Sequence, residues 1–160
     1  MNETLKNNTL DQIVNFYQLD DNIGTSGQPE AEQFRDISAA GYEIVLNLAL
    51  SDSPNAIENE NNIISKLNMI YVHVPVDFKT PSPEDLELFF KHMKKHEDKK
   101  IFIHCVMNWR VSAFMFLYHT IKCQMPIMEA RRHLDAVWQP EPVWQEFIKN
   151  ALNTYAINPD

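Results

Sequence analysis

A chain of 160 residues with 44% hydrophobic, 22% charged and 11% aromatic residues has the composition of one globular domain and not of a disordered protein. Fourteen basic against twenty-two acidic residues give a net charge of -8, and the absence of a long Lys/Arg cluster argues against a nucleic-acid partner. No apolar stretch is long enough for a membrane span, and the polar first twenty residues lack the apolar centre of an export signal, so we expect a cytoplasmic protein.

The chain contains two cysteines, Cys105 and Cys123. They form neither a closely spaced pair nor part of a set of four, so the sequence indicates no disulfide framework and no structural zinc site. His92 and His96 have the spacing of a metal-binding pair on a helix, but without a third ligand we interpret them as a solvated helix end. Nothing in the sequence indicates a cofactor or an oligomeric state.

We expect a single domain over residues 1–160, with a helical extension over residues 1–20. Leu10, Ile13 and Val14 predict a short amphipathic helix in this extension. The stretch Thr25–Pro29, TSGQP, predicts a turn.

Further along the chain, apolar runs of strand length alternate with amphipathic stretches of helix length. The expected buried strands cover residues 42–50, 70–76 and 101–104. The expected helices cover residues 29–41, 56–67, 83–95, 111–121, 125–137 and 142–150. This alternation predicts an α/β fold with a mainly parallel central sheet of about four to five strands and helices on both faces.

The clearest functional signal lies where the third buried strand joins a helix that is apolar nearly all round. Ligand sites of open α/β sheets lie at this edge, the carboxyl ends of the strands. Backbone N–H groups of the loop, the helix N-terminus and an arginine side chain can together bind an oxyanion such as phosphate. The chain there reads His104, Cys105, Val106, Met107, Asn108, Trp109, Arg110, Val111, Ser112.

Cys105 is the candidate nucleophile of this loop. Partial positive charge at a helix N-terminus and a neighbouring guanidinium group favour the thiolate over the thiol. A lone cysteine at a strand end is otherwise a small buried residue. The order strand, Cys105, loop, Arg110, helix favours a functional thiolate.

His104-Cys105 with Arg110 and the following Ser112 resembles the cysteine-dependent phosphatase superfamily, especially small bacterial dual-specificity-phosphatase-like proteins related to the beta-lactamase-hydrolase-like family. The TSGQP turn looks like the opening motif of that family, and the likeness spans about residues 22–144. The resemblance implies a tyrosine-phosphatase-like fold, no cofactor, and hydrolysis of an anionic, phosphorylated substrate.

The resemblance also implies roles for individual residues. Cys105 would attack phosphorus and Arg110 would hold the equatorial oxygens, while His104 would tune the loop and the thiolate by hydrogen bonding. Asp77 would protonate the leaving group and later activate water, although an exposed aspartate at a strand end is also ordinary. Ser112 would donate to the thiolate, but it stands two residues past the arginine, whereas the hydroxyl of the family follows the arginine immediately.

The loop departs from the tyrosine-phosphatase pattern in two ways. Four residues separate Cys105 from Arg110 instead of five, a spacing also found in rhodanese-like sulfurtransferases. The loop contains no glycine, so Asn108 is the residue best able to adopt a positive φ. Met107 and Trp109 would either form a hydrophobic wall over the mouth or pack against the preceding helix.

Three functions therefore stay open at this point. The first is a phosphatase that acts through Cys105. The second is a sulfurtransferase that carries a persulfide on Cys105, and the third is a non-catalytic module that binds an anion.

Overall fold

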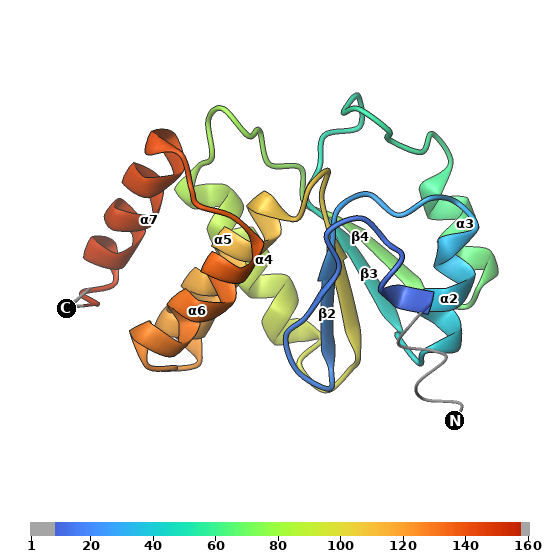
Figure 1. The fold of residues 1–160 in the computed structure, drawn as a ribbon, viewed down its shortest axis with the longest axis horizontal. Coiled ribbons are helices and arrows are strands. Elements are labelled where there is room, and N and C mark those ends of the chain that lie inside the picture. The colour runs from blue at the N-terminus through green and yellow to red at the C-terminus, as the bar shows by residue number, and fades with distance from the viewer. Residues whose placement is uncertain (1–8, 158–160) are drawn as a thin grey trace.

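The structure, a computed structural model, describes residues 9–157 and contains a five-stranded sheet with the order β1-β2-β5-β3-β4 (Figure 1). β1 runs antiparallel to β2, and the other neighbouring strands are parallel. The strands are β1 (Tyr17–Gln18), β2 (Ile23–Ser26), β3 (Ile44–Asn47), β4 (Ile70–His73) and β5 (Ile101–His104). The predicted α/β fold with a mainly parallel sheet is confirmed.

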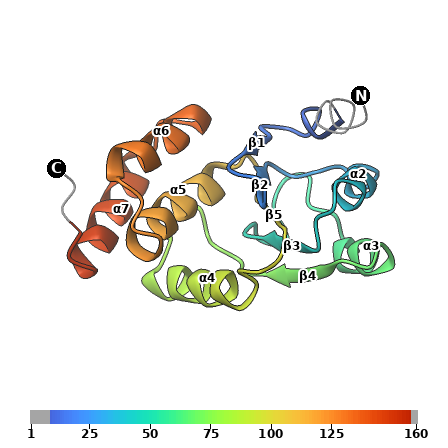
Figure 2. The same ribbon diagram turned by 90° about the horizontal axis from the view of Figure 1, so that it is seen from below.

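Helices cover both faces of the sheet, as predicted (Figure 2). Helices α2 and α3 lie on one face, and α4 to α7 lie on the other. The helices are α2 (Gln33–Ala39), α3 (Glu60–Lys66), α4 (Pro83–Lys95), α5 (Trp109–Leu117), the π-helix η1 (Tyr118–Lys122), α6 (Ile127–Val137) and α7 (Pro142–Thr154). None of those within residues 9–157 is long and apolar enough to cross a bilayer.

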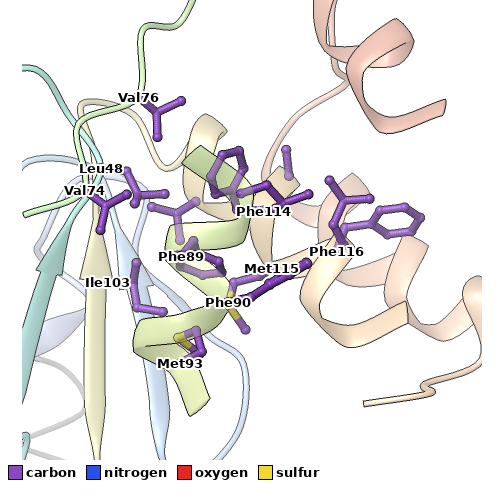
Figure 3. Close-up of a cluster of buried hydrophobic side chains, with 14 of the residues drawn as sticks. Leu48, Val74, Val76, Phe89, Phe90, Met93, Ile103, Phe114, Met115 and Phe116 are labelled. Atoms are coloured by element: carbon purple, nitrogen blue, oxygen red, sulfur yellow. The ribbon is translucent and has the colours of Figure 1, made fainter. Parts of the chain in front are cut away.

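The larger hydrophobic core lies between the sheet and helices α4, α5 and α7. Phe89 of α4 sits between residues at the strand ends, such as Leu48 and Ile103, and Phe114 of α5 (Figure 3). Cys105 belongs to the same core. The strand that carries the candidate nucleophile is therefore fixed by apolar packing on this side.

Two of the predicted strands are shorter than expected. β3 ends at Asn47 because the Asn47 side chain accepts a hydrogen bond from the Ala49 N–H group at 2.8 Å, which turns the chain out of the sheet. β4 ends at His73, two residues before Pro75, which has no N–H group to continue a ladder. The predicted strand 101–104 agrees with β5.

The N-terminal predictions are the ones that the structure corrects. Residues 1–8 of the expected helical extension lie outside the described residues. The expected helix through Val14 is wrong, because helical residues end at Leu10 and the Val14 carbonyl accepts a hydrogen bond from Gly27 instead. Thr25 and Ser26, expected in a turn, form the end of β2. The hydrogen bonds between β2 and β5 outweigh the weak turn propensity of the TSGQP stretch.

The expected helices are present, with shifted ends. Those expected over 29–41 and 56–67 begin four residues later, at α2 and α3, while 83–95 agrees with α4. The helix expected over 111–121 begins two residues earlier, at Trp109, and its last turn is the π-helix η1. This early start places the helix N-terminus directly against the loop after Cys105.

Candidate active site

β5 lies between β2 and β3, so its carboxyl end is the centre of the sheet edge. His104 is in register with Ser26 of β2 and Asn47 of β3. The Cys105 N–H group continues this pairing and donates to the Ser26 carbonyl at 3.3 Å. The loop from Cys105 to Arg110 therefore starts from a rigid position, as expected from the order of elements.

Asn108 gives the loop its turn without glycine. Its φ of 69° lies in the left-handed region, which confirms the prediction from the sequence. The Asn108 side-chain amide donates to the Asn15 carbonyl at 2.9 Å and to the Thr25 hydroxyl at 3.0 Å. These bonds fix the turn to the N-terminal segment and to β2.

Three successive carbonyl groups of the loop face polar groups outside it. The Cys105 carbonyl faces the His104 Nδ1 atom at 3.4 Å, and the Val106 carbonyl accepts from the Gln28 N–H group at 3.0 Å. The Met107 carbonyl accepts from the Asn15 side chain at 2.9 Å. In a trans peptide the N–H group of the next residue points the opposite way, so the N–H groups of Val106 and Met107 point away from these polar groups.

Several N–H groups of the loop have no acceptor in the chain. Within residues 9–157, no hydrogen bond is made by the N–H groups of Val106, Met107, Trp109 or Arg110. Those of Trp109 and Arg110 belong to the first turn of α5, where the N–H groups of any helix lack partners and carry partial positive charge. This set of donors suits an oxyanion.

Gly27 permits the close approach of β2 to this loop. A Cβ atom at Gly27 would collide with the Val106 carbonyl oxygen and with the Val14 side chain. The glycine therefore allows the contact that holds the Val106 carbonyl outward.

The Arg110 side chain is buried, with 6% of its surface exposed. Its Nη1 group donates to the Val76 carbonyl at 2.8 Å, and its guanidinium carbon lies 5.7 Å from the centre of the Phe78 ring. The buried Nε atom has no partner within the described residues. A buried cation with a free N–H group is costly unless a ligand pairs with it.

Asp77 lies between two anchored backbone carbonyls. The Val76 carbonyl before it is held by Arg110, and the Phe78 carbonyl after it accepts from the Trp144 indole N–H at 2.9 Å. The exposed Asp77 carboxylate accepts from the Lys79 N–H group at 2.9 Å. The backbone of Asp77 is thus attached directly to the arginine of the loop.

An aromatic cluster surrounds this attachment, formed by Phe78, Trp109, Trp138 and Trp144. The Trp109 ring stacks on Trp138, with ring centres 5.1 Å apart and planes at 5°, and it lies 5.9 Å from Phe78. Trp109 therefore packs into this cluster. Met107 is 37% exposed.

His104 takes part in a buried polar network on the other face of the sheet. Its Nε2 atom lies 2.7 Å from Glu60 Oε2, and the Gln28 side chain donates to Glu60 Oε1 at 3.0 Å. Burial favours protonation of Glu60, but the charge and hydrogen bond of His104 and the hydrogen bond from Gln28 together lower the pKa of Glu60 below its ordinary value. Glu60 therefore stays ionised at neutral pH.

Ser112 is the predicted site residue that the structure uses differently. Its hydroxyl group donates to the Trp109 carbonyl at 3.0 Å, one turn back along α5. Within the described residues it makes no hydrogen bond to Cys105. Its position two residues past Arg110, noted in the sequence, places it on another part of the helix.

Four residues of the site were missed by sequence reasoning: Asn15, Gln28, Glu60 and Trp144 as a hydrogen-bond donor. Gln28 stands in the TSGQP stretch, so its side chain could have been singled out there. Nothing in the local sequence distinguishes Glu60 from the neighbouring acidic residues, because its partners are brought to it only by the sheet.

The described part of the chain contains no group of three or more His, Cys, Asp or Glu residues arranged to hold a metal ion. The His92 and His96 rings stack with centres 6.4 Å apart at the end of α4. Desolvation and the neighbouring lysines lower the pKa of both rings. Both cysteines are free thiols, Cys105 buried and Cys123 exposed.

Comparison with known proteins shows the family to which the chain is similar. Residues 8–146 match the family described as "DSP-PTPase phosphatase fused to NAD+ Kinase". A crystal structure described as "Putative phosphatase", from Shewanella putrefaciens CN-32, is 31% identical, with a TM-score of 0.83 over 92% of this chain and 97% of that one. A comparison with curated proteins gives no match.

More distant solved structures share the fold. Tk-PTP in its active form is 18% identical, with a TM-score of 0.72 over 87% of this chain and 97% of that one. TpbA of P. aeruginosa, solved with phosphotyrosine, is 10% identical, with a TM-score of 0.69 over 91% and 92% of the two chains. None of these comparisons supports sulfur transfer or a non-catalytic role. The chain belongs to the DSP-PTPase family and is a cysteine-dependent phosphatase with a tyrosine-phosphatase-like fold.

Proposed function

We propose that the protein hydrolyses phosphate monoesters through a cysteinyl-phosphate intermediate on Cys105. The thiolate attacks phosphorus, so that a P–S bond forms while the P–O bond to the leaving group breaks. Asp77 gives its proton to the leaving oxygen. Asp77 then takes a proton from water, the water oxygen attacks phosphorus, and the P–S bond breaks to release inorganic phosphate and the thiolate.

The observation that carries this proposal is the set of unpaired donors around the loop. The N–H groups of Val106, Met107, Trp109 and Arg110 have no acceptor within residues 9–157, and neither has the buried Nε atom of Arg110. A tetrahedral phosphate with three equatorial oxygens can pair with such a set, and its charge would offset the cost of the buried guanidinium.

The role of Asp77 rests on its attachment to Arg110. Arg110 donates to the carbonyl of Val76, the residue before Asp77. A guanidinium that binds phosphate would therefore keep the Asp77 backbone close to the bound substrate. Asp77 is exposed, so its carboxyl group is free to meet a substrate that enters from solvent.

We propose a phosphorylated aromatic group, such as phosphotyrosine, as the first substrate class to examine. TpbA, which shares the fold, was solved with phosphotyrosine. The half-buried Trp109 and the exposed Met107 offer apolar surface beside the loop for a phenyl ring. A reducing, cytoplasmic compartment would keep the Cys105 thiolate available.

Trapping of the phosphoenzyme tests the role of Cys105. We expect the wild type to release phosphate from an aryl phosphate and to give a phosphocysteine after an acid quench, detected by mass spectrometry. Cys105→Ser should lose both signals, whereas Cys123→Ser, a matched change at the exposed cysteine, should keep them. Turnover in the Cys105→Ser variant would remove Cys105 from the mechanism.

A further inference from the structure

Glu60 connects the two groups that turn the first carbonyls of the loop outward. Its Oε2 atom pairs with the His104 ring, whose other nitrogen faces the Cys105 carbonyl. Its Oε1 atom accepts from the Gln28 side chain, whose backbone N–H holds the Val106 carbonyl. One carboxylate thus supports both of the residues that orient successive peptide groups next to the nucleophile.

Both ring nitrogens of His104 face oxygen acceptors. Each ring nitrogen faces an acceptor: Nε2 lies 2.7 Å from the Glu60 carboxylate, and Nδ1 lies 3.4 Å from the Cys105 carbonyl. A neutral imidazole has only one N–H donor, so the lone pair of its other nitrogen would point at an acceptor oxygen. The arrangement is satisfied by the imidazolium form.

The charge pair is enclosed by protein. The side chains of His104 and Glu60 are 0% and 4% exposed. The other titratable groups that face Glu60 are His73 and Tyr71, both on β4, and the remaining aromatic neighbour of His104 is the uncharged Phe34 ring of α2. Removal of Glu60 would leave a buried imidazolium with no anionic partner among these groups, and such a group loses its proton.

We propose that Glu60 is a positioning residue of the reaction, which keeps His104 protonated and thereby orients the Val106 N–H group toward the anion and stabilises the Cys105 thiolate. This inference rests on the proposed function of Cys105. The imidazolium donates to the Cys105 carbonyl, and the Val106 N–H on the opposite side of that trans peptide points toward the interior of the loop. The positive charge of His104, one residue away, favours the sulfur anion.

Alkylation of Cys105 tests the proposal without any turnover. In a Cys123→Ser background, the rate of reaction with iodoacetate is followed from pH 5 to pH 9 by mass spectrometry. Loss of the imidazolium in Glu60→Gln should shift the curve to higher pH and slow the reaction at pH 6 about tenfold. Glu60→Asp, which keeps the charge, should restore most of the rate, and Glu58→Gln, an exposed neighbour, should match the background.

A second measurement needs no variant at residue 60. We expect the nitrogen-15 NMR shifts of both His104 ring nitrogens in the wild type to be those of an imidazolium at pH 7. A neutral His104 ring, or an alkylation curve of Glu60→Gln that coincides with the background, would overturn the proposal. Failure of the proposed function has a different signature, because the wild type would then form no phosphocysteine whatever the alkylation curve shows.

Discussion

The loop from Cys105 to Arg110 is supported by two regions of opposite chemistry. On the face covered by α2 and α3, the support is polar: Glu60, His104 and Gln28 form a buried network of hydrogen bonds and charge. On the face covered by α4 to α7, the support is aromatic: Trp109 stacks in a cluster with Phe78, Trp138 and Trp144. The sheet edge brings both supports to one site.

The difference between the two regions indicates that each supports a different part of the reaction. Hydrogen bonds are directional, so the polar network can orient the loop peptides and stabilise a sulfur anion. Aromatic packing is less directional but buries a large area, so the aromatic cluster can hold the segment that carries Asp77 against the loop. We therefore expect substitutions in the aromatic cluster to impair protonation of the leaving group. Substitutions in the polar network should instead impair the reactivity of the nucleophile.

The largest effect is expected from Asp77→Asn on the aromatic side. An amide cannot protonate the leaving oxygen, so kcat/KM should fall about 100-fold for an alkyl phosphate. For an aryl phosphate whose leaving group needs no proton, the loss should be much smaller. A plot of log kcat/KM against leaving-group pKa should therefore steepen in this variant.

The control for this experiment is Asp98→Asn, an exposed aspartate just beyond α4. It should follow the wild-type line. Equal losses of Asp77→Asn on both kinds of substrate would show that Asp77 supports the fold or substrate binding and is not the acid.

How far the sequence predicts this molecule depends on the range of the interactions. The strand 101–104, the helix 83–95 and the left-handed Asn108 were predicted correctly, because apolar pattern, capping and conformational preference are local. β2 was missed because Ile23 is its only large apolar residue, and the polar or small Gly24, Thr25 and Ser26 become a strand only when β5 pairs with them. The link from Glu60 to His104 spans 44 positions, and no local pattern shows it.

Trp144→Phe should have an intermediate effect. The phenyl ring keeps much of the packing, but the hydrogen bond to the Phe78 carbonyl is lost and a small cavity is left, so the free energy of unfolding should fall by about 1 to 3 kcal/mol. The Asp77 segment should loosen, and kcat/KM for an alkyl phosphate should fall about tenfold. Urea unfolding and the leaving-group series measure the two effects.

Trp138→Phe is the matched control for this change. The Trp138 indole nitrogen is buried without a partner within residues 9–157, so this variant loses no hydrogen bond. It should keep the leaving-group dependence of the wild type. The same steepening in both variants would mean that ring packing, and not the bond to Phe78, holds the Asp77 segment.

The smallest effect is expected on the polar side, in the pH dependence of stability. The pKa of Glu60 is lower in the folded protein than in the unfolded chain, because His104 and Gln28 outweigh the effect of burial. The folded state therefore binds fewer protons at this group. The contribution of Glu60 to stability is fully present above the unfolded carboxyl pKa of about 4.3 and is lost as the pH falls through the folded pKa. Glu60→Gln should be less stable than the wild type at pH 7, and urea unfolding should show the difference shrinking toward pH 3. A constant difference over this range would mean that Glu60 contributes by packing alone, and the polar region would then differ from the aromatic one in composition but not in how it supports the loop.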